Sequence, residues 1–242
     1  MASRAPSRVE RSEPRRPLSR ERVLRAAIDL ADREGITALS MRSLAREIGV
    51  EAMSLYHYVE RKEDLLAALG DMVMQEIELP EAGPGEWKTA VRRMAVSYHK
   101  ALGRHSWFHE LTGGPTGVGP GTLAYMEWVL RTLRRGGFSA RMTHHAYHIL
   151  DSHIVGSSKW EAGIMASVRK AQLPDLAKKV LERVPVDLFP YFHEHAQQHI
   201  GGATKGDKHP FELGLDLILD GLDGLRDEKP KPLRRTKRSP RA

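Results

Sequence analysis

Apolar residues recur three and four positions apart along most of the chain, which is the spacing of one face of an α-helix. No stretch alternates apolar and polar residues in the manner of a half-buried β-strand. The sequence therefore predicts an all-α fold. Helices are expected over residues 19–34, 41–48, 51–59, 62–77, 87–102, 123–135, 139 to 156 or 161, 174–183, 189–199 and 210–225.

Residues that favour helix ends set the limits of these helices. Ser19 and Ser40 precede the first two helices, where a serine hydroxyl can accept a hydrogen bond from a free backbone N–H group. Gly49 ends the second helix and is expected to adopt a positive φ, which glycine reaches at little cost. Two stretches rich in Gly and Pro, residues 79–85 and 113–121, are expected to be loops, and the first separates two domains.

The net charge of +7 is concentrated at the two ends of the chain. Residues 1–18 hold five Arg and two Glu, and residues 229–242 hold seven Lys or Arg and no acid, so the part between them carries about −3. Both ends contain several prolines and are expected to be disordered. Their charge favours contact with DNA phosphates, but solubility and overall composition explain the same charge, and for the C-terminal end this second interpretation is favoured.

The chain has 242 residues and no cysteine, which excludes a disulfide framework and a thiolate zinc site. It shows no signal peptide and no apolar run long enough to cross a bilayer. These features predict a cytoplasmic protein that does not contact the membrane.

Residues 40–62 form two short predicted helices joined at Gly49, and the second has an unusual outward surface. Leu55 is expected to face inward, which leaves small, hydroxyl-bearing and aromatic side chains outside. Two such helices are typical of a helix-turn-helix motif, whose second helix enters the DNA major groove. An ordinary helical hairpin would have a similar apolar pattern, so periodicity alone leaves both interpretations open.

The stretch LSMRSLAREIGVEAMSLYHYVERKEDLLAAL, residues 39–69, resembles the DNA-binding segment of the tetracycline-repressor (TetR) family of transcriptional regulators. The residues that carry the resemblance are Leu39, Arg42, Leu44, Ala45, Gly49, Val50, Leu55, Tyr56, Val59, Lys62, Leu65 and Leu66. It implies a three-helix DNA-binding domain over residues 19–78, preceded by the basic arm of residues 1–18.

The same resemblance implies a role for each outward residue of this segment. Arg42 matches a position that reaches a base edge, and arginine suits guanine O6 and N7. Tyr56 matches a contact to the sugar-phosphate backbone, and Lys62 matches a phosphate contact. Ala52, Met53 and Ser54 match the start of the recognition helix, and His57 lies beside Tyr56 on the same outward side. Ala52 and Met53 are less polar than the residues at these positions in the tetracycline repressor.

The C-terminal part also resembles this family, through HSWF at residues 105–108 and FELGLDLILDGL at residues 211–222. The resemblance implies a larger helical domain for ligand binding and dimerisation over residues 86–226, followed by the basic tail of residues 227–242. It further implies a homodimer in which the helices starting near Ser139 and Pro210 pair with their copies in a four-helix bundle.

The resemblance also implies a chamber for a small-molecule effector among the bulky residues of the second domain, although most of these residues are expected to be core or interface. Its bulky residues suit a largely apolar, aromatic ligand with a few hydrogen-bonding groups. The candidate ligand-binding residues are Tyr98, Trp107, Tyr125, Trp128 and His148. The predicted function is a dimeric repressor that binds a palindromic DNA operator and is released by the effector, with an effector-independent DNA-binding regulator as the alternative.

A third interpretation rests on the histidines of the predicted helix that starts at residue 139. His144, His148 and Asp151 share a helical face, with a spacing that could hold a divalent metal. Polar lining of the chamber or contacts at the dimer interface explain the same pattern. Catalysis would also require a nucleophile or an open metal position, and neighbouring serines offer nothing distinctive. The sequence therefore predicts no enzyme, no cofactor and no metal site.

Overall fold

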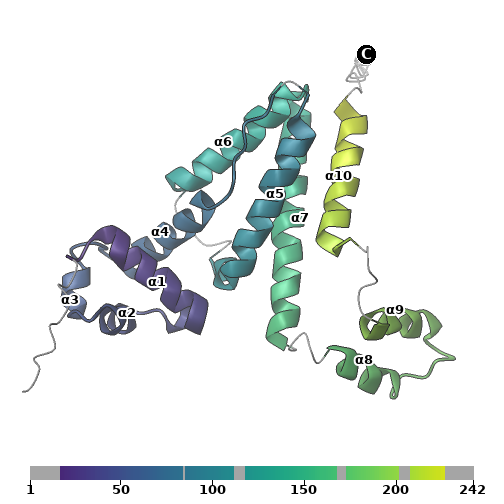
Figure 1. Ribbon diagram of the computed structural model, residues 1–242, viewed down its shortest axis with the longest axis horizontal. Coiled ribbons are helices and arrows are strands. Elements are labelled where there is room, and N and C mark those ends of the chain that lie inside the picture. Colours follow the sequence, from purple (N-terminus) through teal and green to yellow (C-terminus); the bar gives the residue numbers. More distant parts are fainter. Residues whose placement is uncertain (1–16, 84, 112–117, 168–172, 202–207, 227–242) are drawn as a thin grey trace, which may run out of the picture. The chain divides into compact units, whose positions relative to one another are not determined.

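The computed structural model describes residues 17–83, 85–111, 118–167, 173–201 and 208–226. Within these ranges every regular element is an α-helix or a short 3-10 helix and no strand occurs, which confirms the all-α prediction (Figure 1). The chain divides into two compact units, Met1–Leu69 and Gly70–Ala242. No helix in the described ranges combines the length and apolar character needed to cross a bilayer.

The first unit is built around a small apolar core. The first helix packs against the second, and the second packs against the third. Val23, Leu44 and Leu55 are fully buried where these helices meet. The elements are α1 (Arg20–Glu34), η1 (Ile36–Ala38), α2 (Met41–Ile48), α3 (Ala52–Leu55) and α4 (Lys62–Gln75), the last of which continues into the second unit.

Hydrogen bonds at the ends of α2 confirm its predicted limits. The Ser40 hydroxyl accepts from the Ser43 N–H at 3.0 Å, and the Ser43 hydroxyl accepts from the Ser40 N–H at 2.9 Å, so the two residues form a capping box. Gly49 ends α2 with φ 77° and ψ 41°, a left-handed conformation that a residue with a Cβ adopts only with strain.

The second unit is a helical domain whose central helix, α5, contacts three others, α6, α7 and α10. α6 also packs on α7, and α8 packs on α9 (Figure 1). The elements are α5 (Trp87–Arg104), η2 (Ser106–Glu110), α6 (Pro120–Arg135), α7 (Ala140–Ser167), α8 (Leu173–Leu181), α9 (Pro190–Gly201) and α10 (Pro210–Arg226).

Ion pairs and ring stacking both join α10 to the rest of the second unit. Arg92 of α5 pairs with Glu212 at 3.1 Å and with Asp216. Hydrogen bonding from Lys208 and the charge of Arg92 lower the pKa of Asp216 although burial opposes them. The Phe211 ring stacks on the His99 ring, with centroids 3.9 Å apart, and on the His153 ring, with centroids 5.2 Å apart.

The largest differences from the predicted helix limits concern three helices. α7 continues to Ser167, beyond the expected end at residue 156 or 161. α3 has four residues, so Tyr56 and His57 lie in the turn that follows it. α6 begins at Pro120, inside the predicted loop of residues 113–121. Residues 113–117 of that loop, the basic tail 227–242 and all but the last two residues of the basic arm 1–18 lie outside the described residues.

Candidate functional site

The short α3 helix is fixed against α2 by both backbone and side-chain contacts. The N–H groups of Gly49 and Val50 both donate to the Ala45 carbonyl, at 2.9 and 3.0 Å, which turns the chain sharply after α2. Leu55 of α3 and Val59 beyond it are buried in the core of the unit. Because one side of this segment is anchored, its other side chains are held toward solvent.

The outward side of this segment carries five of the predicted DNA contacts. Met53 is 72% exposed, and Tyr56 and His57 are also exposed. Ala52 and Ser54 are half-buried beside them. The exposed Met53 side chain and the exposed Tyr56 ring leave apolar surface on this turn available for contact with a partner.

The two predicted basic contacts flank this surface in sequence. Arg42 is the second residue of α2 and Lys62 is the first residue of α4, and both are exposed. Among the described residues no acid lies within ion-pair distance of either, whereas the neighbouring Arg61 pairs with Asp64 at 3.2 Å. Arg42 and Lys62 are therefore available to bind phosphates or base edges.

A second set of polar groups meets in the interior of the second unit. Tyr98 of α5 and Tyr125 of α6 are buried, with ring centroids 5.2 Å apart in an edge-to-face arrangement. The Tyr125 hydroxyl donates to Asp151 Oδ1 of α7 at 3.2 Å. Tyr147, one turn before Asp151, has its ring centroid 6.3 Å from that of Tyr125. We call these four residues the tyrosine cluster.

The electrostatics of the tyrosine cluster keep its phenols protonated. Burial raises the pKa of Asp151, and the hydrogen bond from Tyr125 and the charge of His148 oppose that effect. Burial and the charge of Asp151 raise the pKa of Tyr98 and Tyr125 above the usual range, and they raise the pKa of Tyr147 to about 12. The cluster therefore offers hydroxyl donors and one carboxylate acceptor.

The structure brings together only some of the predicted ligand-binding residues. Tyr98 and Tyr125 are in contact, and His148 is exposed with its ring centroid 5.2 Å from that of Tyr147. Trp107 is buried in η2 beside His105. Trp128 lies elsewhere, as described below. Tyr147 was not among the predicted ligand-binding residues, although it lies one turn before Asp151 on α7.

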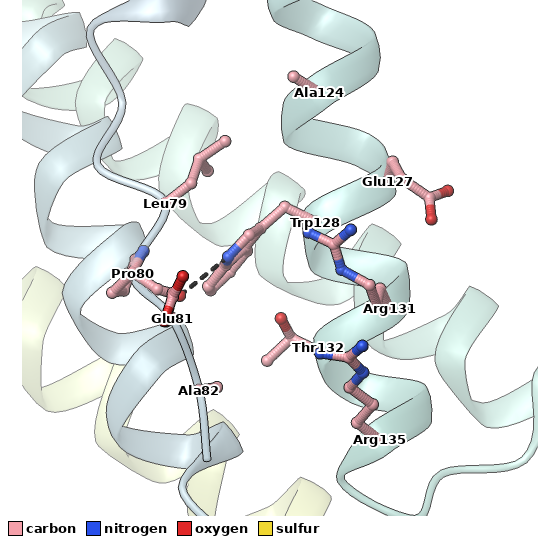
Figure 2. Close-up of a pocket in the computed structure, with 10 residues that line it drawn as sticks. All are labelled: Leu79, Pro80, Glu81, Ala82, Ala124, Glu127, Trp128, Arg131, Thr132 and Arg135. Atoms are coloured by element: carbon pink, nitrogen blue, oxygen red, sulfur yellow. Dashed lines mark hydrogen bonds between the residues drawn. The ribbon is translucent and has the colours of Figure 1, made fainter.

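Trp128 lines a separate pocket of about 710 Å³ between α6 and residues 79–82 (Figure 2). Its indole Nε1–H donates to the Pro80 carbonyl at 3.0 Å, so this polar group is already paired. Arg131 and Arg135, from successive turns of α6, line the same pocket with Glu81 and other residues. Most of its polar lining is charged and exposed, unlike the tyrosine cluster.

The face of α7 that carries His144, His148 and Asp151 has a spacing that could hold a metal ion, and the structure gives its acid a hydrogen-bonding partner. Asp151 accepts a hydrogen bond from Tyr125, and His144 and His148 contact each other through their rings, with centroids 4.5 Å apart. In the described part of the chain, no group of three or more His, Cys, Asp and Glu side chains is placed to hold a metal ion.

Known proteins resemble this chain along most of its length. Residues 23–69 match the family model for bacterial regulatory proteins of the tetR family, and residues 79–225 match the model for the tetracyclin repressor-like C-terminal domain. The HTH-type transcriptional repressor DrrR1 of Streptomyces coeruleorubidus is 32% identical over 219 residues, covering 88% of this chain and 80% of that protein. Tetracycline repressor protein class D of Escherichia coli is 32% identical over 211 residues, covering 85% and 89%.

A solved structure is similar to most of this chain. The Streptomyces coelicolor TetR family protein ActR, in complex with actinorhodin, superimposes with a TM-score of 0.71 and 28% identity over 88% of this chain and 100% of that chain. These relatives are transcriptional regulators rather than enzymes. Their similarity to this chain identifies it as a DNA-binding transcriptional repressor controlled by a small-molecule effector. Both family models together span the helix-turn-helix and the helical domain, so the chain belongs to the TetR family of transcriptional regulators.

Proposed function

We propose that the operator is read by the exposed residues of α2, α3 and the start of α4. The observation that carries this proposal is the exposure of Met53 and Tyr56 on either side of the fully buried Leu55. In this arrangement the segment after Gly49 enters the major groove, and exposed cations on both sides of it bind the backbone. The proposed DNA-binding residues are Arg42, Ala52, Met53, Ser54, Tyr56, His57 and Lys62.

The protein acts as a homodimer formed through α7 and α10 in this proposal. Leu217 of α10 is 66% exposed and Leu213 lies exposed one turn before it. Trp160 of α7 is 63% exposed, and Ile149 is exposed on the same helix. Large apolar side chains left in water on two adjacent helices are typical of a subunit interface. Two copies related by a two-fold axis read half-sites about one helical turn, roughly 34 Å, apart.

The tyrosine cluster is the proposed effector site. It places three phenols and a carboxylate between α5, α6 and α7, and His148 marks the edge of the cluster that reaches solvent. An effector that prefers one conformation of the dimer shifts the population toward it. If that conformation binds operator less well, affinity falls by the coupling free energy, which is typically about 1–3 kcal/mol.

Selection of genomic fragments by the purified protein, followed by footprinting, tests the DNA-reading proposal. We expect a palindrome with two half-sites, and Arg42→Ala and Tyr56→Ala should each weaken binding to it by tenfold or more, on the order of 1.4 kcal/mol. Because both side chains are exposed, circular dichroism and the melting temperature should stay unchanged. Arg135→Ala, an exposed arginine of the second unit, is the matched control and should bind normally.

Binding that is sensitive to salt but shows no sequence preference would contradict this proposal, because the basic ends of the chain would then explain it. Equal binding by wild type and the Arg42→Ala protein would contradict it as well. For the dimer, Leu217→Glu should give a monomer in sedimentation velocity, whereas Leu123→Glu, at an exposed leucine of α6, should remain dimeric. A dimeric Leu217→Glu protein would contradict the assigned interface.

A further inference from the structure

Asp151 is a half-buried carboxylate among aromatic side chains from three helices. Tyr125 of α6 donates to its Oδ1 at 3.2 Å. Tyr98 of α5 and Tyr147 of α7 both lie close enough for the charge of Asp151 to raise their pKa values, after the larger effect of burial. The ring centroids of Tyr98 and Tyr147 lie 5.2 and 6.3 Å from that of Tyr125, so the three rings form a continuous aromatic group.

The protein itself supplies little positive charge to Asp151. Within the described residues, Tyr125 is its hydrogen-bond donor, and no Lys, Arg or His forms an ion pair with it. His148, which is exposed, is the cation whose charge acts on it. A carboxylate removed from water without a counter-ion costs several kcal/mol, which is why burial raises the pKa of Asp151.

We propose that the effector carries an aromatic group and a protonated amine, and that the amine pairs with the Asp151 carboxylate among Tyr98, Tyr125 and Tyr147. This inference rests on the proposed effector site and names the class of ligand that the site binds. An ammonium group supplies the missing counter-ion and strong charge-assisted hydrogen bonds. The tyrosine rings add cation–π attraction when the cation lies within about 6 Å of a ring centroid.

Other ligand classes fit the same groups less well. A neutral hydroxyl can donate to Asp151, but it leaves the charge of the carboxylate uncompensated. A carboxylate ligand would be repelled by Asp151, because like charges in a poorly solvated site raise the free energy of both. The effector should therefore be recognised by its positive charge as well as by its apolar surface.

The proposed pairing also predicts how affinity depends on pH. An ammonium binds the ionised form of Asp151, so its affinity is full above the pKa of this residue and is lost as the pH falls through that raised pKa. The phenols of Tyr98, Tyr125 and Tyr147 remain protonated throughout this range.

Isothermal titration calorimetry of the full chain with three matched probes tests the proposal. The probes are 1-naphthylmethylamine, 1-naphthalenemethanol and 1-naphthoate, which share a ring system and differ in their polar group. We expect the amine to bind at least about tenfold more tightly than the alcohol, and the carboxylate to bind most weakly. Loss of the preference for the amine as the pH falls should accompany this order.

Two variants assign the preference to the carboxylate. Asp151→Asn keeps an acceptor for the Tyr125 hydroxyl but removes the charge, so amine and alcohol should then bind within about twofold of each other. Tyr98→Phe keeps the ring and removes only a hydroxyl, so it should retain the preference for the amine. A circular dichroism spectrum and a melting curve for each variant establish that it is folded.

Several results would overturn the proposal. One is binding of the alcohol or the carboxylate as tightly as the amine, and another is no binding of any probe. The others are an unchanged preference for the amine in the Asp151→Asn protein, or an equal loss of that preference in the Asp151→Asn and Tyr98→Phe proteins. If any of these occurs while Arg42→Ala still weakens operator binding, the ligand class is wrong and the proposed mode of DNA recognition stands. If Arg42→Ala leaves operator binding intact, the proposed mode of DNA recognition is wrong irrespective of the probes.

Discussion

Replacing Gly121 by alanine should destabilise the protein, because the first turn of α6 lies directly against α4. The Gly121 N–H donates to Asp71 Oδ1 at 2.8 Å, and the Thr122 N–H donates to the same oxygen at 3.1 Å. Asp71 thus caps α6 from a different helix. A Cβ on Gly121 would lie 2.7 Å from the Asp71 backbone oxygen and 2.8 Å from Cγ of Gln75.

Two opposing effects determine the size of the change. Alanine is favoured over glycine within a helix by roughly 0.5–1 kcal/mol. A contact as short as that with the Asp71 backbone oxygen forces a shift, and overpacking of this kind typically costs about 1–3 kcal/mol. Displacement of the cap adds to the loss, at about 1 kcal/mol. We expect a net destabilisation of about 1–3 kcal/mol, which lowers the melting temperature of a chain of this size by roughly 2–4 °C per kcal/mol.

Gly103→Ala is the matched control for this substitution. Gly103 is an exposed residue of α5, and a Cβ there would meet no atom within 4 Å. It should therefore show the helix preference alone and raise the melting temperature. Both variants should be compared by differential scanning calorimetry at one protein concentration, because the stability of a dimer depends on concentration. If Gly121→Ala stabilises the protein as much as Gly103→Ala, the close packing of α6 on α4 is refuted.

Three further predictions concern the core of the first unit, the charge of Asp216 and the Trp128 hydrogen bond at the pocket. Leu55→Ala should lower the free energy of unfolding by about 2–5 kcal/mol in chemical denaturation. Met53→Ala should change it by less than about 0.5 kcal/mol but should weaken operator binding. Similar losses of stability in both variants would contradict the assignment of Leu55 to the buried side and Met53 to the exposed side. Asp216, whose pKa is lowered, stabilises the fold above its unfolded-state pKa of about 3.9 and loses this effect as the pH falls through its native pKa. The melting temperature of Asp216→Asn should therefore converge with that of wild type in acid, and a constant difference would refute the assignment. Trp128→Phe, which removes the donor to the Pro80 carbonyl, should cost about 1 kcal/mol in thermal melts, and no change would show that this bond adds nothing to stability.

The helices could be predicted from the sequence because their signals are local. The capping box of Ser40 and Ser43 spans four residues, and Gly49 ends α2 through a bond to Ala45. The predicted end of α7, at residue 156 or 161, was wrong because the helix continues through Gly156 to Ser167. Gly156 has no positive φ and meets no side chain, so it remains within the helix, where a glycine costs only about 1 kcal/mol.

The ligand site could be predicted only in part, because its contacts join residues distant in sequence. Tyr98 and Tyr125 were expected from their aromatic character alone. Asp151 was grouped with His144 because of their helical spacing, but its hydrogen-bond partner is on α6, 26 residues away. Helical spacing shows which residues share a face, but it does not show which neighbouring helix that face meets.

The contact between Asp71 and α6 also bears on how the two proposed sites communicate. α4 begins at Lys62, a proposed phosphate contact, and Asp71, nine residues later on the same helix, caps α6. α6 in turn carries Tyr125, whose hydroxyl binds Asp151 in the proposed effector site. The part of α4 in the second unit is therefore joined by its cap on α6 to the helix that carries Tyr125. An effector that displaces Tyr125 acts on the first turn of α6, and the closeness of Gly121 to α4 leaves little room for that turn to move without moving α4.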